Sequence, residues 1–446
     1  MVTKKTASKK AAAPKPRTGK SNRAVYIVDG NRTPFLKARG VPGPFTASDL
    51  AVYSGRQLLA RQPFDPAELD EVILGCIMPT ADEANIARVV SLRLGCGNHV
   101  PAWTVQRNCA SGMQSIDCAA QNIAMGRSDL ILAGGAEAMS YAPLLFSNAM
   151  ATWFGKFSSA RDVGSKLKLL SKFRPSLLTP VIALLKGLSD PVVGLSMGQT
   201  AEIIGHRFSI SREAMDAYAV QSHQRLTAAN EQGRLSEIEV LYDSNGKFYD
   251  HDDGVRPDAN VEKLATLKPV FDKEFGLVTS ANSSQITDGA AWVILASEDA
   301  VKKHQLPVLA RVADSEWAGL DPSQMGLGPA HAMAPILKRN KLNVEDVDYW
   351  EINEAFAAQV LACVEAWKDS NYCRTELHTR SAIGEIDQSK LNVDGGGISL
   401  GHPVGASGAR VVLHMCHLLE RNNAKRGLAS LCIGGGQGGA MMLERD

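Results

Sequence analysis

Short apolar runs alternate with segments of helical periodicity along most of the chain. The run AVYIVDG from Ala24 is typical of a buried strand, whereas residues 45–62 repeat apolar positions at the spacing of a helix. The alternation continues to residue 140, where DLILAGGAEAMS reads as a strand that ends in a glycine turn. This order of strands and helices predicts an α/β fold.

The last third of the chain repeats that order. The stretches Asp65–Gly75 and Asn343–Asn353 both lead from an acidic helix end into a strand, and CASG at 109–112 resembles GASG at 405–408. A helix follows each of these short motifs and leads to a strand that ends in glycines. We therefore expect a duplicated fold, in which loops of both halves meet at one site.

Breaks in the pattern divide the chain into four parts. Residues 1–22 contain seven basic residues and no acid, which predicts a disordered tail. We expect one α/β half to comprise residues 23–140 together with 286–306, and the other to comprise residues 307–446. Between them, helices, turns and a charged hairpin-like stretch predict an inserted loop domain over residues 141–285.

Composition narrows the class of protein. The chain has 446 residues, 45% of them hydrophobic, so it can bury a large core. A net charge of +1 gives no reason to expect nucleic acid as a partner, and no long uncharged apolar run suggests a transmembrane helix. Eight cysteines without a secretory signal predict reduced thiols in a bacterial cytoplasm. Mitochondrial targeting by the basic tail is the less favoured alternative.

Cys109 is the first candidate for chemistry. It lies between a short strand at residues 101–106 and a helix that continues to about residue 125. A thiol at a helix N-terminus is close to unpaired N–H groups and to the positive end of the helix dipole, both of which favour the thiolate. The alternative is a small buried hydrophobic residue, which is what most free cysteines are.

Three further clusters occupy similar junctions. Asn353 lies in NEAFAAQ, His402 in GGGISLGHPVGASG, and Cys432 in CIGGGQGG, where the N–H of Gly434 can form part of an anion-binding nest. Taken singly, these residues could be a helix cap, a turn histidine and a buried strand residue. All of them fall at predicted strand-to-helix or strand-to-turn junctions, where α/β sheets bind ligands, and this favours a shared site with Cys109.

Other motifs point elsewhere but lack the right context. GLSMG, which contains Ser196, matches a hydrolase elbow, yet only a very short apolar stretch precedes it. The glycines from Gly434 onward fit a dinucleotide pattern, but a strand follows them in place of a helix. His414 and His417 share a helix without a second ligand pair, so we expect helix packing and no metal site.

Together, NCASGMQ, NEAFAA, GGGISLGHPVGASGAR and CIGGGQGGA resemble the motifs of the thiolase family, in the same order, and the match runs from Ala24 to the end. The resemblance implies two α/β halves stacked as five αβαβα layers, an inserted loop domain that holds coenzyme A, and a homodimer or homotetramer. The long middle segment is similar to the beta subunit of the trifunctional fatty-acid oxidation complex and its bacterial counterparts. That branch usually has His at the position of Asn353.

The resemblance also implies the role of each candidate. Cys109 would attack a 3-ketoacyl-CoA and hold the shortened acyl group as a thioester, while His402 takes the thiol proton. Cys432 would act as acid and base on the acetyl-CoA carbon. His402 and a water held by Asn353 would stabilise one oxyanion, and the N–H groups of Cys109 and Gly434 the other.

Coenzyme A would then be a co-substrate, with no tightly bound cofactor. The matching coenzyme-binding positions are Met197, Arg256, Phe271, Ser280, Ser284, Ala355 and Phe356. Three alternatives stay open: acetoacetyl-CoA synthesis from two acetyl-CoA, a ketoacyl-synthase type of condensing enzyme, and a non-catalytic lipid-binding protein. The second cysteine, Cys432, argues against the condensing enzyme, and the complete catalytic set argues against the last.

Residues 161–187 are not needed by either half of the duplicated fold. Val163, Leu167 and Leu170 recur at helical spacing among lysines, and the stretch holds six basic residues and one acid. One interpretation is a lid over the acyl tunnel. The other is a basic amphipathic hairpin that contacts an anionic membrane or a partner subunit with hydratase and dehydrogenase activities.

Overall fold

The computed structural model describes residues 23–445, so the predicted tail at 1–22 lies outside the described residues. Ten strands form one sheet, in which the order β12-β13-β14-β11-β1-β10-β5-β3-β4 runs from one edge to the other and β2 pairs with β10. The strands on either side of the β1–β11 pairing belong to the two halves of the molecule. Between β1 and β11, only two residue pairs are formed, Tyr26–Arg311 and Ile27–Ala310.

Four strands of each half have the same order, β3-β5-β10-β1 in the first and β12-β13-β14-β11 in the second, and β4 is an additional edge strand of the first half. In the first, β3 runs parallel to β4 and β5, and β10 runs antiparallel to both β5 and β1. In the second, β12 runs parallel to β13, and β14 runs antiparallel to both β13 and β11. The predicted duplication is therefore confirmed at the level of topology. The strands of the two halves are β1 (Val25–Arg32), β2 (Leu36–Lys37), β3 (Glu71–Gly75), β4 (Ala102–Val105), β5 (Leu130–Ala138), β10 (Thr287–Ser297), β11 (Ala310–Gly319), β12 (Tyr349–Ile352), β13 (Arg426–Ile433) and β14 (Gln437–Glu444).

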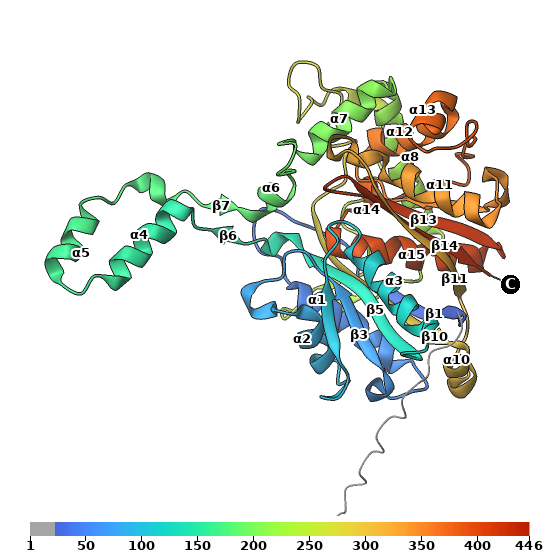
Figure 1. Ribbon diagram of the computed structural model, residues 1–446, viewed down its shortest axis with the longest axis horizontal. Coiled ribbons are helices and arrows are strands. Elements are labelled where there is room, and N and C mark those ends of the chain that lie inside the picture. The colour runs from blue at the N-terminus through green and yellow to red at the C-terminus, as the bar shows by residue number, and fades with distance from the viewer. Residues whose placement is uncertain (1–22, 446) are drawn as a thin grey trace, which may run out of the picture.

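Helices cover the outer faces of both half-sheets and fill the space between them (Figure 1). The central layer is formed by α3 and α15, and α15 packs on β5 and β10 of one half and on β12 and β13 of the other. A helix in such a position must be apolar on nearly all sides, and α15 is buried along almost its whole length. The helices of these layers are α1 (Ala47–Ala60), α2 (Ile86–Arg93), α3 (Ser111–Ala124), α10 (Glu298–His304), α11 (Gly328–Asn340), α12 (Ala357–Lys368), α13 (Ser370–Thr375), α14 (Gly397–Leu400) and α15 (Val404–Arg421).

The inserted residues form two structures rather than one domain. Helices α7 and α8 pack against α12 of the second half, whereas α4 and α5 lie on an arm (residues 144–187) that extends away from the body (Figure 1). The limits proposed for the domains stay predictions. The elements of the insertion are β6 (Leu144–Leu145), α4 (Asn148–Ser159), α5 (Val163–Leu170), β7 (Val181–Ile182), α6 (Ala183–Gly187), α7 (Met197–Arg207), α8 (Arg212–Glu231), β8 (Leu241–Tyr242), β9 (Phe248–Tyr249) and α9 (Val261–Ala265).

Two glycines let the central helices cross in backbone contact. A Cβ atom on Gly112 of α3 would lie 2.7 Å from the backbone nitrogen of Ala409, and one on Gly408 of α15 would lie 2.5 Å from that of Met113. Any larger residue would push the helices apart, so glycine is required at both positions. The crossing brings the N-terminal ends of α3 and α15 together. Among residues 23–445, no helix is long and apolar enough to cross a membrane.

The helix crossing can be tested through stability. We expect Gly112→Ala to lower the free energy of unfolding by about 1–3 kcal/mol, the usual cost of overpacking a close contact. Gly155→Ala in α4 is the control, because nothing lies within 4 Å of the added Cβ. Urea denaturation measures both changes. Equal stability of the two variants would contradict the close approach of α3 and α15.

Candidate active site

Cys109 lies in the turn that leads from β4 into α3. Asn108, just before it, has a φ of 42°, a left-handed conformation that asparagine tolerates better than most residues. The Asn108 side chain donates a hydrogen bond of 2.7 Å from Nδ2 to the carbonyl oxygen of Gly434. The turn that carries Cys109 is thereby tied to the glycine loop of the other half, as the sequence predicts.

Burial controls the protonation of Cys109. It raises the pKa of this thiol above its ordinary value, and the N–H groups of Gly434 and of Cys109 itself only partly oppose that effect. The N–H groups favour the thiolate, as the sequence predicts, but the cost of desolvating the charge is larger, so the pKa of the thiol is raised overall. Cys109 needs a base to remove its proton.

Cys432 lies at the end of β13, close to Cys109. Burial, and then the proximity of Cys109, raise the pKa of the Cys432 thiol well above its ordinary value. After it the chain turns through Gly435 and Gly436, both with positive φ, before β14 begins. The two halves of the fold thus place one protonated thiol each at a common site.

His402 is buried in the turn between α14 and α15. Its Nδ1 lies 2.6 Å from Oγ of Ser407, and within the described part of the chain its Nε2 has no hydrogen-bond partner. Burial, and secondly the charge of Arg410, lower the pKa of His402 to about 3. The imidazole is therefore neutral at physiological pH, and one of its nitrogens is free to interact with a substrate or a thiol.

Asn353 follows β12 and faces His402. Its Nδ2 lies 3.4 Å from Nδ1 of His402, and its Oδ1 accepts a hydrogen bond of 3.1 Å from Nη2 of Arg410. The alternative interpretation as a helix cap is wrong, because α12 begins after Phe356, which occupies the N-cap position. Asn353 is thus a buried polar group of the site.

Three of the seven predicted coenzyme positions, Met197, Phe271 and Phe356, take part in two apolar contacts. Met197 opens α7, and its sulfur lies 3.4 Å from the place that a Cβ on Gly434 would occupy. Phe271 packs edge to face on Phe356 with a centroid distance of 6.1 Å.

The remaining positions flank these rings. The N–H of Ser284 donates a hydrogen bond of 2.9 Å to the carbonyl oxygen of Ala355. Arg256 and Ser280 are exposed, and the backbone N–H of Arg256 donates to Nδ1 of His223 at 3.2 Å. Among the apolar positions, Met197 therefore lies beside Gly434, and Arg256 is a charged group at the surface.

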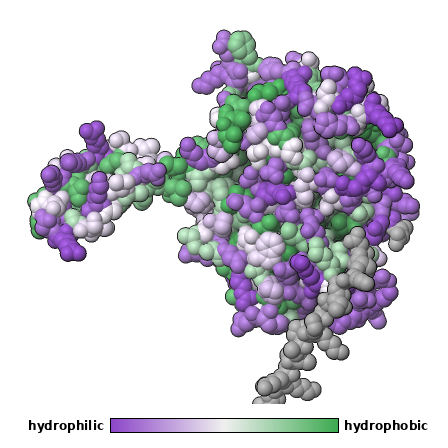
Figure 2. All heavy atoms as spheres, in the orientation of Figure 1, coloured by the Kyte–Doolittle hydropathy of each residue, from purple (hydrophilic) through white to green (hydrophobic). Residues whose placement is uncertain are grey.

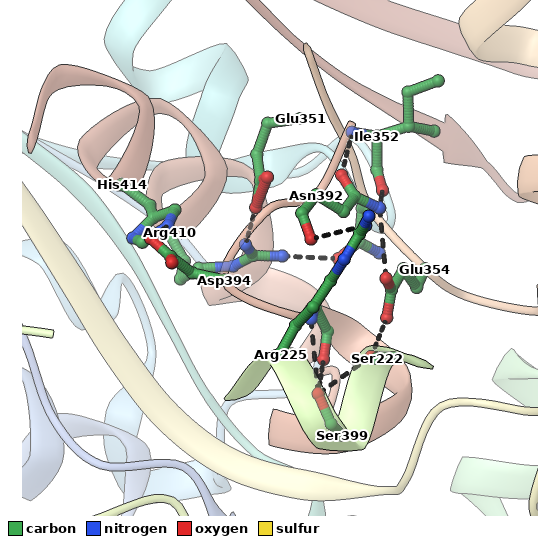
Figure 3. Close-up of polar contacts among 12 residues, drawn as sticks. Ser222, Arg225, Glu351, Ile352, Glu354, Asn392, Asp394, Ser399, Arg410 and His414 are labelled. Carbon is green, nitrogen blue, oxygen red and sulfur yellow. Dashed lines mark hydrogen bonds and ion pairs between the residues drawn. The ribbon is translucent and has the colours of Figure 1, made fainter. Parts of the chain in front are cut away.

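Sequence reasoning missed the residues that support the site. Glu354 is buried and accepts hydrogen bonds from Ser222 of α8 and from Asn392 (Figure 3). It also accepts one from the hydroxyl of Tyr218. These bonds tie the motif of Asn353 to the inserted helix α8. Glu354 lies in the quoted NEAF motif, so a buried acid beside Asn353 was the available signal.

A second missed acid lies on the side of Cys109. Glu137 at the end of β5 accepts hydrogen bonds of 3.0 Å from the N–H groups of Ile77 and Met78, and burial raises its pKa to about 7. From its sequence, the junction AGGAEAMS that carries Glu137 predicts only the end of a strand.

The motifs that lack the right sequence context for catalysis or metal binding have structural roles. Ser196 caps α7 by accepting a hydrogen bond from the N–H of Gln199. His414 lies between Glu237 and Asp394, at 3.0 and 3.2 Å, and these carboxylates raise the pKa of its imidazole to about 10. It belongs to a buried ionic cluster, and across residues 23–445 no group of three His, Cys, Asp or Glu side chains could hold a metal.

This fold and site define a duplicated α/β protein with a pair of thiols and a neutral histidine at the interface of its halves. The model of the thiolase N-terminal domain matches residues 25–299, and that of the thiolase C-terminal domain matches residues 306–445. The chain therefore belongs to the thiolase family.

Named relatives match nearly the whole chain. The mitochondrial 3-ketoacyl-CoA thiolase of Rattus norvegicus is 40% identical over 95% of this chain and 98% of its own. The 3-ketoacyl-CoA thiolase of Yersinia pestis (strain Pestoides F) is 36% identical over 97% and 99%.

Solved structures agree with these matches. Human mitochondrial 3-ketoacyl-CoA thiolase in complex with CoA has a TM-score of 0.81 at 38% identity, covering 95% of this chain and 98% of that one. Acetyl-CoA acetyltransferase from Syntrophomonas wolfei has a TM-score of 0.83 at 34% identity, covering 96% and 100%. These levels of similarity extend to both halves and confirm the five-layered fold expected from the sequence.

The protonation states at the site predict how Cys109 reacts. We expect His402→Ala to slow alkylation of Cys109 by iodoacetamide at pH 7 by roughly a hundredfold, because the thiol then lacks a base. The difference should close as the pH rises above the pKa of the thiol. Half-buried Cys118 is the internal control. Peptide mapping by mass spectrometry follows both rates, and an equal slowing of Cys118 would point to a general structural change instead.

Proposed function

We propose that this protein is a thiolase that cleaves 3-ketoacyl-CoA into acetyl-CoA and a shortened acyl-CoA, as an acyltransferase of fatty-acid β-oxidation. The observation that carries the proposal is the crossing of α3 and α15, which together with the hydrogen bond from Asn108 to Gly434 gathers the turns of Cys109, His402 and Cys432 at one place. One thiol can hold an acyl group while the other moves a proton, and both tasks are needed to break a carbon–carbon bond beside a ketone. The named relatives support the substrate class.

In the first half-reaction, His402 takes the proton of the Cys109 thiol and the sulfur attacks the 3-keto carbon. The bond between C2 and C3 then breaks, leaving the shortened acyl group as a thioester on Cys109. Cys432 gives its proton to C2, which leaves as acetyl-CoA. A neutral histidine suits the first step, because an imidazolium could not accept the proton.

In the second half-reaction, CoA resolves the thioester. The Cys432 thiolate takes the proton from the CoA thiol, and the CoA sulfur attacks the acyl carbon. Cys109 leaves and recovers its proton from His402. The oxyanions of the two half-reactions would be stabilised by two sets of donors, His402 with an Asn353-held water and the N–H groups of Cys109 and Gly434, at about 3 kcal/mol for each donor.

Coenzyme A is the co-substrate, and no tightly bound cofactor is required. Met197 beside Gly434 and the packed rings of Phe271 and Phe356 offer apolar contacts that suit the pantetheine part of CoA, while exposed Arg256 suits a phosphate. We extend to this chain the homodimer or homotetramer that the family resemblance implies.

The reverse direction is the second candidate function. Two acetyl-CoA molecules would form acetoacetyl-CoA through the same groups, because each step is reversible, and the similarity to an acetyl-CoA acetyltransferase favours keeping this direction open. Rates measured on 3-ketoacyl-CoA substrates of increasing length, and on acetyl-CoA alone, distinguish the two. A non-catalytic role is not favoured, because all groups of the mechanism are present.

The separate roles of the two thiols, acyl transfer at Cys109 and proton transfer at Cys432, can be tested. We expect Cys432→Ser to reduce turnover by about 10²- to 10⁴-fold while Cys109 still becomes acylated by an acyl-CoA, because only the proton transfer to carbon is impaired. Cys373→Ser is the matched control, a buried cysteine of the same half whose sulfur donates to backbone carbonyls. Steady-state rates and intact-protein mass follow the two steps. Near-normal turnover of Cys432→Ser would refute its role.

The arm carries a second proposed property, contact with an anionic membrane surface. Seven basic residues and a single acid, Asp162, lie between residues 144 and 187. Large apolar side chains are exposed on the same arm, including Val163, Leu167 and Leu170 on one face of α5. Figure 2 shows hydrophilic and hydrophobic residues side by side along the arm. This combination is typical of helices that bind at a lipid interface.

The helices of the arm pack on each other, and the arm extends away from the body (Figure 1). The Trp153 ring stacks on Phe157 and meets Phe173 edge to face, both at 5.1 Å, and its Nε1 donates to the carbonyl oxygen of Leu169. These contacts hold α4 to the segment of α5. Because the arm points away from the body (Figure 1), contact with an external surface is favoured over the lid interpretation.

Vesicle binding tests the arm. We expect the double variant Lys166→Glu/Lys168→Glu to lose most of its co-sedimentation with anionic vesicles, since each basic residue near such a surface contributes about 1 kcal/mol. Binding of the parent protein should weaken at high salt and be absent with neutral vesicles. Lys338→Glu/Lys425→Glu, an equal charge change on the exposed body, is the control.

Two outcomes would contradict membrane contact. If parent and arm variant bind anionic vesicles equally, the arm is not the contact. If the parent binds no vesicle but co-purifies with a hydratase-dehydrogenase subunit that the arm variant loses, the surface serves that partner instead.

A further inference from the structure

One face of α15 carries two buried polar side chains that reach the candidate catalytic groups. Ser407 and Arg410 lie three residues apart, so they project from the same side of the helix. Ser407 is fully buried and Arg410 is 2% exposed. Burying a charged guanidinium is costly unless specific partners compensate for the loss of water, so Arg410 needs such partners.

Ser407 contacts Nδ1 of His402, the ring nitrogen on the opposite side from the free Nε2. Its Oγ lies 2.6 Å from Nδ1 of His402 and 3.1 Å from the carbonyl oxygen of Pro403. The carbonyl can only accept, so the serine hydroxyl donates to it. The serine oxygen then accepts the Nδ1 proton of His402, which leaves a lone pair on Nε2.

Arg410 makes a forked contact beneath the site. Its Nη1 donates to Oε1 of Glu351 at 2.6 Å, and its Nη2 donates to Oδ1 of Asn353 at 3.1 Å. Figure 3 shows the guanidinium of Arg410 directed at Glu351. The buried carboxylate supplies the opposing charge that keeps the guanidinium in place.

This fork determines which way the Asn353 amide faces. A guanidinium has only donors, so the oxygen of the amide must point to Arg410 and its NH₂ group must point to His402. The NH₂ group lies 3.4 Å from Nδ1 of His402, too long and in the wrong role for a strong bond when Nδ1 carries the proton. Its donors are therefore left for a water or a substrate oxygen.

We propose that Ser407 and Arg410 are positioning residues of the reaction: Ser407 selects the histidine tautomer with its free electron pair on Nε2, and Arg410 fixes Asn353 with its NH₂ group toward the site. Neither residue touches the substrate. The proposal rests on the thiolase function proposed above and assigns the roles of two residues beneath that site.

Ser407→Ala tests the first role. We expect kcat to fall by roughly ten- to a hundredfold with KM changed little, because proton transfer is impaired and CoA contacts are not. Alkylation of Cys109 by iodoacetamide at pH 7 should slow to a similar extent, while the rate at Cys118 stays the same. At high pH, where the thiol ionises unaided, the rate at Cys109 should return to that of the parent.

Ser54→Ala is the matched control. Ser54 is also fully buried in a helix, and its hydroxyl donates to the carbonyl oxygen four residues earlier, as that of Ser407 does. It lies on α1, outside the site. The two variants lose the same kind of helix contact, so a difference between them reports the contact with His402 alone.

Arg410→Lys tests the second role. Lysine keeps the charge that Glu351 requires but cannot span both partners as a planar fork does. We expect kcat to fall at least tenfold with alkylation of Cys109 nearly unchanged, since Asn353 acts on the substrate oxygen and not on the thiol. Arg410→Gln should in addition raise the pKa of His402, because the charge of Arg410 is one cause of its low value.

Three results would overturn the proposal or its basis. If Ser407→Ala behaves as Ser54→Ala does in kcat and in Cys109 alkylation, Ser407 has no positioning role. If Arg410→Lys retains the kcat of the parent, the fork does not control Asn353. If the parent itself turns over no 3-ketoacyl-CoA, the proposed function fails, and the alkylation rates still report whether Ser407 orients His402.

Discussion

The close crossing of α3 and α15 is the constraint on which the rest of the structure depends. Each half of the fold contributes one of these helices, and the residues just before them include Cys109 and His402. Gly112 and Gly408 allow the two backbones to touch, which brings both helix starts to one place. A separation larger by one methyl group would move Cys109 away from Gly434, so packing and chemistry depend on the same contact.

Burial then decides how the groups at that place behave. It raises the pKa values of both thiols and lowers that of His402, so the site holds neutral groups rather than an ion pair. Because these groups are neutral at rest, no charge is buried in the site before the substrate arrives. The charges that hold Asn353 in place lie behind these neutral groups, where Arg410 and Glu351 compensate each other.

The order of elements, the duplication and the junction residues Cys109, His402 and Cys432 could be predicted from the sequence, because each depends on local periodicity and turn chemistry. The protonation of Cys109 could not, since burial is a property of the assembled halves. The orientation of Asn353 depends on Arg410, which lies 57 residues away along the chain. Likewise, the basic character of the arm was readable from its composition, whereas its direction away from the body was not.

Trapping the acyl-enzyme tests the central claim most directly. The protein is mixed with a 3-ketoacyl-CoA in the absence of free CoA, and the released acetyl-CoA and the modified peptide are measured by mass spectrometry. The account predicts one acetyl-CoA per active site and the shortened acyl group on Cys109. An acyl group on Cys432 or Ser196 with Cys109 unmodified, or no release of acetyl-CoA, would contradict it.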